Sequence, residues 1–437
     1  MSDLEQLYTC FKQSNGITTD TRQCKEGMMF VALRGENFDG NRYAAEALEK
    51  GCSYVVVDNS DYADEANPQI ILVDDSLKAL QQLACHHRRQ MGTTIVGVTG
   101  TNGKTTTKEL MAAVLKRRYN VLYTQGNLNN HIGVPLTLLQ LTEAHEIAIV
   151  EMGANHPGDI KELVDIAEPN YGVITNVGMA HLQGFGSLEG VIRTKGELYD
   201  YIRTTEKSTI FLNAENEHLK TIAEGLNTIC YGRPSTDGAS LYVAGEVIAC
   251  DPYLRFRWQC EKNDWHEVAT HIVGSYNMDN ALCAATVGTY FGVSAEEVSA
   301  ALAEYIPTNN RSQLTETERN TLIVDAYNAN PTSMRAALDN FACMEVSPKM
   351  VILGDMKELG EATAEAHQAV VEHLCECQFG EVWLVGAAFA ATQHGAARVF
   401  ADADAVKEEL LRCPIEKRYI LVKGSNSMKL SSLVPYL

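Results

Sequence analysis

The chain has 437 residues, a length that accommodates about three domains of ordinary size. Hydrophobic residues make up 45% of it and charged residues 21%, which is the composition of a soluble globular protein. The formal net charge of −20 argues against a general nucleic-acid binder, because a phosphate backbone is bound by clusters of Lys and Arg, but it leaves room for one focused pocket that holds a phosphate-bearing small molecule.

The sequence shows no membrane or targeting signal. No apolar run approaches the roughly 18 residues that a membrane-spanning helix requires, and the first residues lack the basic start and apolar core of a signal peptide. The twelve cysteines are scattered between Cys10 and Cys413, and the close pair Cys375 and Cys377 has no second pair to complete a metal site. We therefore expect a cytoplasmic protein without membrane insertion, with reduced thiols in its core.

Residues 1–92 are predicted to form a small α/β unit. Residues 29–33 and 54–57 are short runs of the kind found in strands. Residues 42–50 lie between them and have helical spacing, and residues 77–89 are predicted to form a helix that leads to the next unit.

Residues 93–306 are predicted to form a second unit. A buried strand at residues 94–98 leads through a glycine-rich loop into a helix. Strands that alternate with helices imply a mostly parallel sheet. Further strands are expected at residues 147–150, 172–175 and 209–212, and Leu254, Phe256 and Trp258 alternate with arginines as in an antiparallel strand.

Residues 307–437 repeat the alternation of strands and helices, which is typical of a doubly wound sheet. The predicted strands are residues 322–324, 350–353, 382–385 and 419–422. The expected fold class is therefore α/β in three domains: a small N-terminal domain, a central domain with a mostly parallel sheet around the glycine-rich loop, and a Rossmann-like C-terminal domain.

The glycine-rich loop at residues 97–106 has the residue types that bind nucleotide phosphates. Glycines let backbone N–H groups approach phosphate oxygens, and the N-terminus of the following helix adds partial positive charge. Lys104 can bridge the β- and γ-phosphates of ATP, and the Thr105 hydroxyl can ligate Mg²⁺. Val98 stands where the common motif has its first glycine, but the strand–loop–helix context is the one that the motif requires. That context favours ATP binding over a turn with an incidental Gly-Lys-Thr.

Three further side chains are candidates for the same site. Glu151 follows a predicted strand, so it should lie at the carboxyl edge of the sheet, where it either binds Mg²⁺ or is an ordinary exposed acid. His181 also lies just past a strand, where a lone histidine is more often structural. Lys195 lies in a helical run at residues 187–201, where a solvated lysine is the default.

These residues together resemble the Mur ligase family. The loop spacing Gly-x-x-Gly-x-x-Gly-Lys-Thr, with Val98 between Gly97 and Gly100, is the family's form of the phosphate loop. Residues 127–130, 325–331 and 422–425 resemble the MurF branch in particular. Other matching segments cover nearly the whole chain: residues 19–22, 30–35, 126–130, 133–135, 151–153, 176–181, 195–197, 277–280, 325–330, 354–356 and 423–425.

The resemblance implies an ATP-dependent carboxylate–amine ligase of peptidoglycan precursor synthesis. Such an enzyme joins D-alanyl-D-alanine to UDP-N-acetylmuramoyl-tripeptide, with ATP and Mg²⁺, and releases ADP and phosphate. ATP first phosphorylates the terminal carboxylate of the tripeptide, and the amine of D-alanyl-D-alanine then attacks the acyl phosphate. The first step is needed because a carboxylate is a poor electrophile until its oxygen can leave as phosphate.

The resemblance also implies roles for individual residues. The catalytic residues would be Lys104, Lys195 and His181. ATP would contact Gly100, Thr101, Asn102, Gly103, Lys104, Thr105, Thr106, Asn277, Asn280, Arg311 and Asp325. One Mg²⁺ would bind near Thr105 and Glu151, and a second near His181 and a carbamylated Lys195, whose carbamate would supply the anionic oxygens that Mg²⁺ prefers. The N-terminal domain would bind the UDP-sugar, and the substrate contacts would be Thr21, Arg22, Asn129 and Asn130.

Several assignments leave alternatives open. Tyr276 stands where related sequences have a histidine, which leaves the detail of the adenine contact open. Arg311 could instead be a linker residue, and Asp325 could be an ordinary charge at a strand end, as could Lys423. The segment with Thr21 and Arg22 could equally be a turn.

Two other functions fit parts of the pattern. A sister enzyme of the superfamily, such as an earlier muramyl ligase or a folylpolyglutamate synthase, would share the phosphate loop, but the folate resemblance begins near that loop and lacks a UDP-sugar unit. A nucleotide-gated regulatory protein would not need Lys104, Glu151, His181 and Lys195 together. We expect a monomer whose C-terminal domain closes over the central one through a hinge at residues 306–311.

Overall fold

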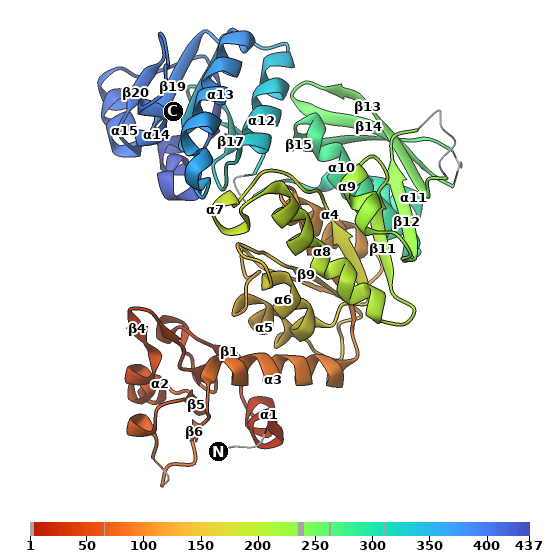
Figure 1. The fold of residues 1–437 in the computed structure, drawn as a ribbon, viewed down its shortest axis with the longest axis vertical. Helices are drawn as coiled ribbons and strands as arrows, with labels where there is room; N and C mark the ends of the chain where they lie inside the picture. The colour runs from red at the N-terminus through yellow and green to blue at the C-terminus, as the bar shows by residue number, and fades with distance from the viewer. Residues whose placement is uncertain (1–3, 65, 235–239, 262–263, 309–310) are drawn as a thin grey trace.

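The computed structural model describes residues 4–64, 66–234, 240–261, 264–308 and 311–437. Three large sheets follow one another along the chain, and helices cover each of them. Figure 1 shows the three resulting domains along the long axis, with the N-terminal domain (red) at one end and the C-terminal domain (blue) at the other. The predicted three-domain α/β fold class is confirmed, while the boundaries at residues 92 and 306 stay predictions.

The N-terminal domain is built on a parallel four-stranded sheet with helices around it. In sheet order its strands are β1 (Ile17–Thr18), β2 (Met29–Val31), β5 (Tyr54–Val57) and β6 (Ile70–Leu72), and β3 (Arg34–Gly35) and β4 (Phe38–Asp39) form a separate hairpin. Its helices are α1 (Leu4–Lys12), α2 (Ala44–Glu49) and α3 (Ser76–Met91). The helix predicted at residues 42–50 begins as a 3₁₀ turn because the Asp39 carboxylate caps Asn41 N–H.

Helix α3 joins the N-terminal domain to the central one. It starts where the Asp75 carboxylate caps its first turn, and it ends at Gly92, whose φ of 65° lies in the left-handed region. Arg88 near its end donates to the carbonyl oxygens of Ala167 and Glu168, at 3.0 and 2.7 Å. These bonds attach α3 to the end of a central-domain helix, and Figure 1 shows α3 lying between the two domains.

The central domain is built on a nine-stranded sheet with the order β15-β14-β13-β12-β11-β10-β7-β9-β8. Its strands are β7 (Thr94–Thr99), β8 (Val121–Tyr123), β9 (Ile147–Glu151), β10 (Tyr171–Ile174), β11 (Thr209–Asn213), β12 (Thr228–Gly232), β13 (Val243–Cys250), β14 (Tyr253–Cys260) and β15 (His266–Val273). The predicted antiparallel strand is confirmed, because β14 pairs antiparallel with β13 and β15. Leu254, Phe256 and Trp258 point from it into the core.

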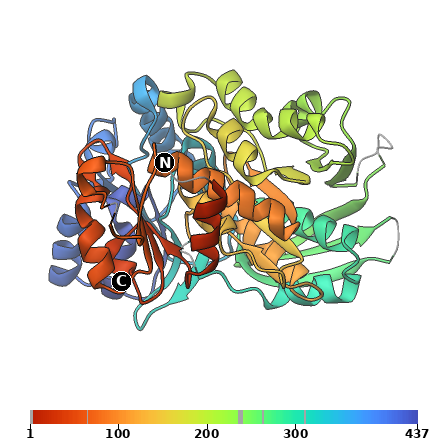
Figure 2. The same cartoon turned by 90° about the horizontal axis from the view of Figure 1, so that it is seen from below.

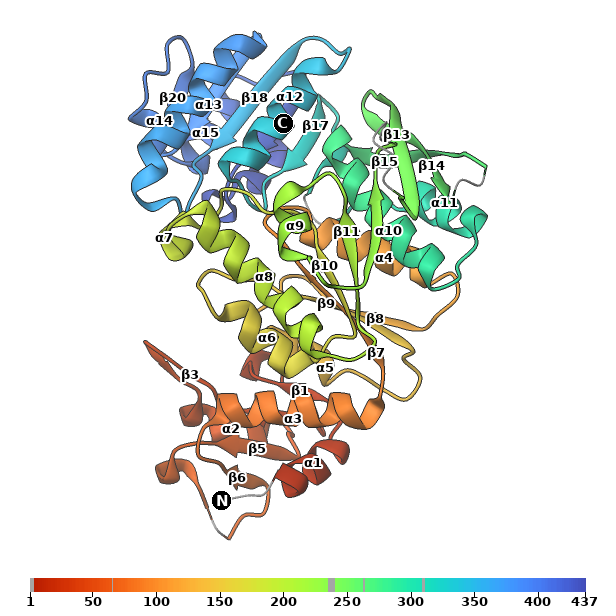
Figure 3. The ribbon, with the colours of Figure 1, turned by 45° about the vertical axis from the view of Figure 1, so that its right-hand side comes forward.

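Helices cover both faces of the central sheet. They are α4 (Lys104–Leu115), α5 (Gly133–Leu138), α6 (Asp159–Ala167), α7 (Leu182–Phe185), α8 (Leu188–Thr204), α9 (Glu217–Ile222), α10 (Met278–Tyr290) and α11 (Ala295–Glu304). Side chains of β7 alternate between the faces: Val96 and Val98 pack with α4 and α10, whereas Ile95 packs with α6 and α8. Figure 3 shows these two layers.

The C-terminal domain has a six-stranded sheet in which every pair except the edge pair β16·β17 is parallel. In sheet order the strands are β16 (Gln313–Glu316), β17 (Thr321–Asp325), β21 (Tyr419–Lys423), β18 (Lys349–Gly354), β19 (Glu381–Val385) and β20 (Arg398–Phe400). The helices are α12 (Pro331–Cys343), α13 (Thr363–Cys377), α14 (Ala387–Ala390) and α15 (Ala403–Arg412). One hydrophobic core lies on each face, which confirms the predicted doubly wound pattern.

The antiparallel end of the central sheet lies away from the N-terminal domain. Figures 1 and 2 both show strands β13–β15 (green) on the opposite side of the molecule from the red segment. Within the described ranges no helix is long and apolar enough to cross a membrane.

Candidate active site

The phosphate loop lies between β7 and α4, at the carboxyl edge of the central sheet. β7 pairs with β9 on one side, with Val98 opposite Glu151, and with β10 on the other, with Thr99 opposite Ile174. Strands β8 and β9 lie on one side of β7 and strand β10 on the other, so the chain changes sides after β9. Open parallel sheets bind ligands in the crevice that such a switch point creates.

Two glycines of the loop are required by its geometry. Gly100 has a φ of 139°, and a Cβ there would lie 2.0 Å from Thr175 Oγ1. Gly103 has a φ of 78°, and a Cβ there would lie 2.5 Å from Asn280 Oδ1. Val98, in contrast, lies inside β7 with its side chain fully buried, so it needs none of the freedom of glycine. This explains physically why the chain departs from the common motif at that position.

Hydrogen bonds hold the loop in shape. Thr175 Oγ1 donates to the Asn102 carbonyl oxygen at 2.6 Å, and Asn102 N–H donates to Asn176 Oδ1 at 3.0 Å. Thr101 N–H donates to the carbonyl oxygen of Asn176 at 2.9 Å. These bonds fasten the loop to the segment after β10.

Lys104 folds back onto its own loop. Its Nζ donates to the carbonyl oxygens of Gly100 and Thr101, at 2.7 and 3.1 Å. Burial lowers the pKa of Lys104 to about 8. The nearby Arg311 guanidinium also lowers this pKa, whereas the Glu151 carboxylate raises it. A phosphate oxygen at this point would replace the two carbonyl acceptors and favour the charged ammonium.

Glu151 is the centre of a buried polar cluster beside the loop. Its side chain is only 1% exposed, and its Oε1 accepts hydrogen bonds from Thr105 Oγ1 at 3.2 Å and Asn129 Nδ2 at 2.9 Å. Its Oε2 is buried and accepts no hydrogen bond from the described residues. The predicted magnesium ligands Thr105 and Glu151 are thus in contact, and the alternative of an exposed acid is wrong.

Lys108 is a functional candidate that the sequence analysis missed. Its side chain is 0% exposed, and its Nζ lies 3.6 Å from Glu151 Oε2 and 3.3 Å from Glu109 Oε1. It supplies the positive charge that a carboxylate needs in such a buried position. Its position three residues after Thr105 on the same helix was the available signal, since residues at this spacing share one face.

The predicted adenine contacts lie beside the phosphate loop, on the central-domain side of the cavity. Asn280 Oδ1 accepts a hydrogen bond from Thr107 Oγ1 at 3.0 Å, and Asn280 Nδ2 donates to Asn277 Oδ1 at 2.8 Å. The hydroxyls of Tyr276 and Ser312 lie 2.8 Å apart. Both asparagines and Tyr276 line the same cavity as the phosphate loop.

His181 reaches this cavity, and its nearest charged partner comes from another domain. Its φ of 51° lies in the left-handed region, and its Nδ1 pairs with a carboxylate oxygen of Glu358 in the C-terminal domain. The pKa of Glu358 is lowered chiefly by its hydrogen bond to His181. His181 therefore stands at a contact between domains as well as at the site.

Lys195 is buried, which corrects the expectation of a solvated lysine. It is 2% exposed, and its Nζ lies 5.3 Å from the ring centroid of Phe185. Burial holds the pKa of Lys195 well below its usual range, and the positive charge of Lys104 acts in the same direction. Lys195 follows Val191 by four residues and precedes Leu198 by three, so it shares the buried face of α8. Within the described ranges it does not line the cavity.

The C-terminal domain supplies the other wall of the cavity, whose volume is about 760 Å³. Arg311 lies with its guanidinium 4.1 Å from the ring centroid of Tyr327, and Asp325 pairs with the buried Lys423. All four line the cavity. Arg311, Asp325 and Lys423 therefore face the cavity. The sequence alone had left open that Arg311 is a linker residue and that Asp325 and Lys423 are ordinary charges at strand ends. Two residues of the predicted hinge, Asn309 and Asn310, lie outside the described residues.

The predicted substrate contacts are divided between two cavities. Asn129 and Asn130 line the cavity at the phosphate loop, and Asn130 also lines a second cavity of about 740 Å³ between the N-terminal and central domains. Asp20 and Gln23 line this second cavity, but Thr21 and Arg22 line neither of these two. Arg22 is 86% exposed on its side chain and bonds to Asp20 in a capped 3₁₀ turn. The turn alternative describes this segment, and the binding roles of Thr21 and Arg22 stay predictions.

Comparison with known proteins supports one family. Models of the family match along the chain: "Mur ligase family, catalytic domain" at residues 13–88, "Mur ligase middle domain" at 98–288, and "Mur ligase, glutamate ligase domain" at 310–426. The UDP-N-acetylmuramoyl-tripeptide–D-alanyl-D-alanine ligase of Bacillus subtilis is 36% identical over 431 residues, which cover 96% of this chain and 92% of the relative.

Solved structures agree with this relation. MurF from Acinetobacter baumannii superposes with a TM-score of 0.87 at 28% identity, over 99% of this chain and 97% of that one. MurF from Thermotoga maritima, solved in complex with ADP, superposes with a TM-score of 0.84 at 25% identity, over 100% and 98% of the two chains. With the phosphate loop, Glu151 and the C-terminal wall gathered at one cavity, this chain belongs to the Mur ligase family, in its MurF branch.

Proposed function

We propose that this chain is the ATP-dependent ligase that joins D-alanyl-D-alanine to UDP-N-acetylmuramoyl-tripeptide. The observation that carries this proposal is the meeting of two domains at one cavity. The central domain contributes the phosphate loop with Lys104, and the C-terminal domain contributes Arg311, Asp325 and Lys423. A volume of about 760 Å³ lies within the usual range of ligand pockets and provides room for a nucleotide and two reacting ends.

The residues around Glu151 fit a magnesium ion. Thr105 and Glu151 offer a hydroxyl and a carboxylate, which are the hard oxygen donors that Mg²⁺ prefers. Glu151 Oε2 accepts no hydrogen bond from the described residues, so an ion could bind this oxygen beside the Lys108 ammonium, which lies 3.6 Å from it. When bound, Mg²⁺ would offset the negative charge of the ATP phosphates.

In the first half-reaction the tripeptide carboxylate attacks the γ-phosphorus of ATP, and ADP leaves. Lys104 turns its N–H groups from the carbonyl oxygens of Gly100 and Thr101 to the phosphate oxygens. The N–H groups of the loop and the N-terminus of α4 stabilise the remaining negative charge of the phosphates. Arg311 faces the same cavity from the C-terminal domain. Docking of that domain would therefore place a second positive charge beside the phosphoryl group that is transferred.

In the second half-reaction the amine of D-alanyl-D-alanine attacks the acyl carbon and phosphate leaves. The attacking amine must be neutral, and its proton leaves as the amide forms. The cations Lys104, Arg311 and Lys423 surround the cavity in which the tetrahedral intermediate carries negative charge. A dry, closed cavity also protects the acyl phosphate from hydrolysis, which favours closure of the C-terminal domain before chemistry.

Lys195 is proposed to carry a carbamate in the active enzyme. The support is its burial beside Phe185 on the same side of the sheet as His181, where an ammonium has no carboxylate within ion-pair distance among the described residues. A carbamate would turn this cation into an anionic oxygen donor. ¹³C NMR of the protein equilibrated with ¹³C-bicarbonate at neutral pH, with Lys195→Arg as the control, should show a carbamate resonance that the variant lacks. Equal spectra of the two proteins would contradict the carbamate.

The proposed activity is tested by phosphate release from ATP. The purified chain with Mg²⁺ and UDP-N-acetylmuramoyl-tripeptide should release phosphate only when D-alanyl-D-alanine is added, and a pentapeptide product should appear by mass spectrometry. Release without dependence on the dipeptide would indicate a sister ligase. No release with any muramoyl acceptor would refute the ligase activity. The cytoplasmic location and the monomeric state stay predictions.

A further inference from the structure

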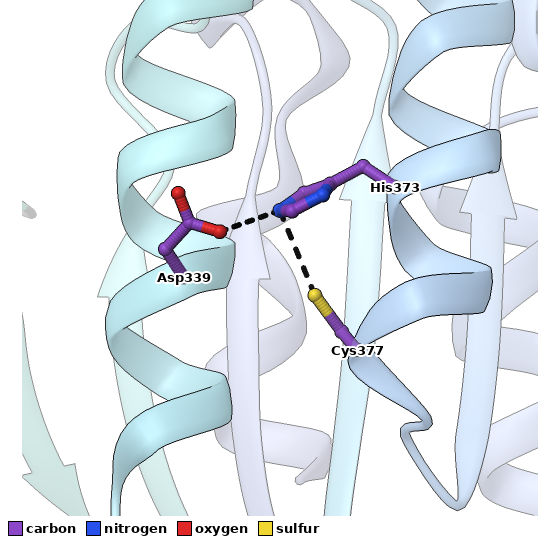
Figure 4. Close-up of side chains that lie close together, drawn as sticks. All are labelled: Asp339, His373 and Cys377. Atoms are coloured by element: carbon purple, nitrogen blue, oxygen red, sulfur yellow. Dashed lines mark hydrogen bonds and ion pairs between the residues drawn. The ribbon is translucent and has the colours of Figure 1, made fainter.

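Between two helices of the C-terminal domain, the structure brings together three potential metal ligands of different chemistry. Asp339 lies on α12, and His373 and Cys377 lie one turn apart on the neighbouring helix α13. Among the described residues they form a group whose ligand atoms all lie within 4.8 Å of one another. Figure 4 shows the three side chains pointing into the space between the two helices.

The distances in this cluster suit a small tetrahedral ion. His373 Nε2 lies 3.6 Å from Cys377 Sγ and 2.6 Å from Asp339 Oδ1. Metal bonds of about 2.0–2.3 Å in a tetrahedron separate neighbouring ligand atoms by roughly 3.3–3.8 Å. The His373–Cys377 separation already lies in this range, and Asp339, which is half exposed, can move outward to admit an ion.

A second observation is the orientation of the His373 ring. Its Nδ1 lies 2.9 Å from a carboxylate oxygen of Glu376, so its Nε2 is directed at Asp339 and Cys377. Histidines that bind metals usually donate their other ring N–H to a carboxylate, which fixes the tautomer and the ring. Glu376 gives His373 this arrangement without being a ligand itself.

Charge adds a third reason for a cation at this place. The carboxylates of Asp339 and Glu376 both lie within hydrogen-bond distance of the His373 ring, and the exposed Arg335 guanidinium lies 3.8 Å from the second carboxylate oxygen of Asp339. A negative cluster with one exposed arginine favours a divalent cation. Asp339, His373 and Cys377 combine oxygen, nitrogen and sulfur donors, a set that suits Zn²⁺ better than Mg²⁺.

We propose that Asp339, His373 and Cys377 bind a zinc-class divalent ion, with water as the fourth ligand. Binding forms bonds from the metal to Cys377 Sγ, His373 Nε2 and Asp339 Oδ1, and two protons leave to solvent: the thiol proton of Cys377 and the proton of the His373–Asp339 hydrogen bond. The ion would fasten α12 to α13. Because Thr332 and Ser333 in the first turn of α12 line the active-site cavity, the ion would also steady one wall of that cavity.

Titration of the full-length, chelator-treated protein with Co²⁺ tests this site. Co²⁺ bound to a thiolate gives a sulfur-to-cobalt charge-transfer band, and no cysteine lines the active-site cavity as far as the chain is described, so metal bound there gives no such band. We expect one equivalent to produce the band, and Zn²⁺ to remove it by competition. Absence of the band in the unmodified protein would overturn the proposal.

Matched variants assign the band to these residues. Cys377→Ser should abolish it, whereas Cys375→Ser, an exposed cysteine two residues away on the same helix, should leave it intact. Glu376→Gln should weaken Co²⁺ affinity by about 10- to 100-fold, because Glu376 only orients the histidine. A band that survives Cys377→Ser, or one that Cys375→Ser removes, would refute the assignment. Circular dichroism checks that each variant is folded.

Discussion

The two walls of the active-site cavity are built in different ways. On the central side, Glu151, Thr105 and Lys108 are almost fully buried and bonded within one domain. The central domain also contacts the C-terminal domain through the buried Val273 and the partly buried Tyr253, which pack with the C-terminal core. At the cavity itself the contacts between the two walls include polar ones, such as the bond from Asn330 Nδ2 to Asn102 Oδ1 at 2.7 Å and the contact of His181 with Glu358.

The difference indicates which part of the site is formed before ligands bind. Breaking a buried ion pair costs several kcal/mol, whereas exposed pairs contribute little. The Glu358 side chain is 54% exposed, so its pair with His181 holds the C-terminal domain only weakly. We infer that the phosphate site is permanent and that the C-terminal wall docks and releases during turnover. The following predictions test that contrast.

The largest effect is expected for Lys104→Ala. Removing this cation from a preformed phosphate site should lower kcat by about 10³-fold or more, since it stabilises the charge of the transferred phosphoryl group. Phosphate release measures it, and Lys220→Ala on the exposed surface of α9 is the control. A loss below about tenfold would mean that the phosphates do not bind at the central-domain wall of the cavity.

Lys195→Ala should lower kcat by about 10²-fold, because it removes the carbamate proposed at this position and with it an anionic oxygen donor for Mg²⁺. Added bicarbonate should not restore the activity, since alanine cannot be carbamylated. Near-normal turnover of this variant would reduce Lys195 to a structural residue of the buried face of α8.

Lys108→Met should destabilise the protein by about 3–5 kcal/mol, because it leaves Glu151 buried without its cation. Urea denaturation measures the free energy of unfolding. The double variant Lys108→Met/Glu151→Gln should recover part of the loss. Equal stability of Lys108→Met and the unmodified chain would show that the ion pair of Lys108 with Glu151 does not stabilise the central-domain wall.

The smallest effect is expected at the domain contact. Glu358→Ala should leave kcat within about threefold and extend the scattering profile of the ligand-free protein, because an exposed pair is worth at most about 1 kcal/mol. Glu361→Ala, which changes a neighbouring exposed acid, is the control. Identical profiles of Glu358→Ala and Glu361→Ala would show that this ion pair does not hold the domain.

The same contact should depend on pH. The pKa of Glu358 is lowered by its hydrogen bond to His181, so the contribution of its carboxylate is present above the ordinary carboxyl pKa and is lost as the pH falls through the lowered value. Scattering of the ligand-free protein should therefore show a more extended molecule in acid. A profile that is unchanged by acid would mean that other contacts determine the docking.

The sequence predicted features formed within the central domain better than contacts between domains. The strands, the loop and the place of Glu151 are local patterns, so periodicity and the edge rule for parallel sheets were enough. The His181–Glu358 contact joins residues that are far apart in the chain, and no local pattern predicts it.

Three misses had a local signal, and the first is Lys108, which follows Thr105 by three residues on α4. Helical spacing places Lys195 on the buried face of α8, but solvation is the usual expectation for a lysine. His373 and Cys377 lie four residues apart on one helix, a spacing that brings two side chains to the same face. The third member, Asp339, could not be found from the sequence, because only the packing of α12 against α13 brings it there.

The most direct test of the central claim follows an oxygen atom. The terminal carboxylate of UDP-N-acetylmuramoyl-tripeptide is labelled with ¹⁸O, and the phosphate released in the presence of ATP, Mg²⁺ and D-alanyl-D-alanine is analysed by mass spectrometry. If the chain activates the carboxylate as an acyl phosphate, each phosphate carries one ¹⁸O from the tripeptide. Phosphate without the label, formed together with product, would contradict the account.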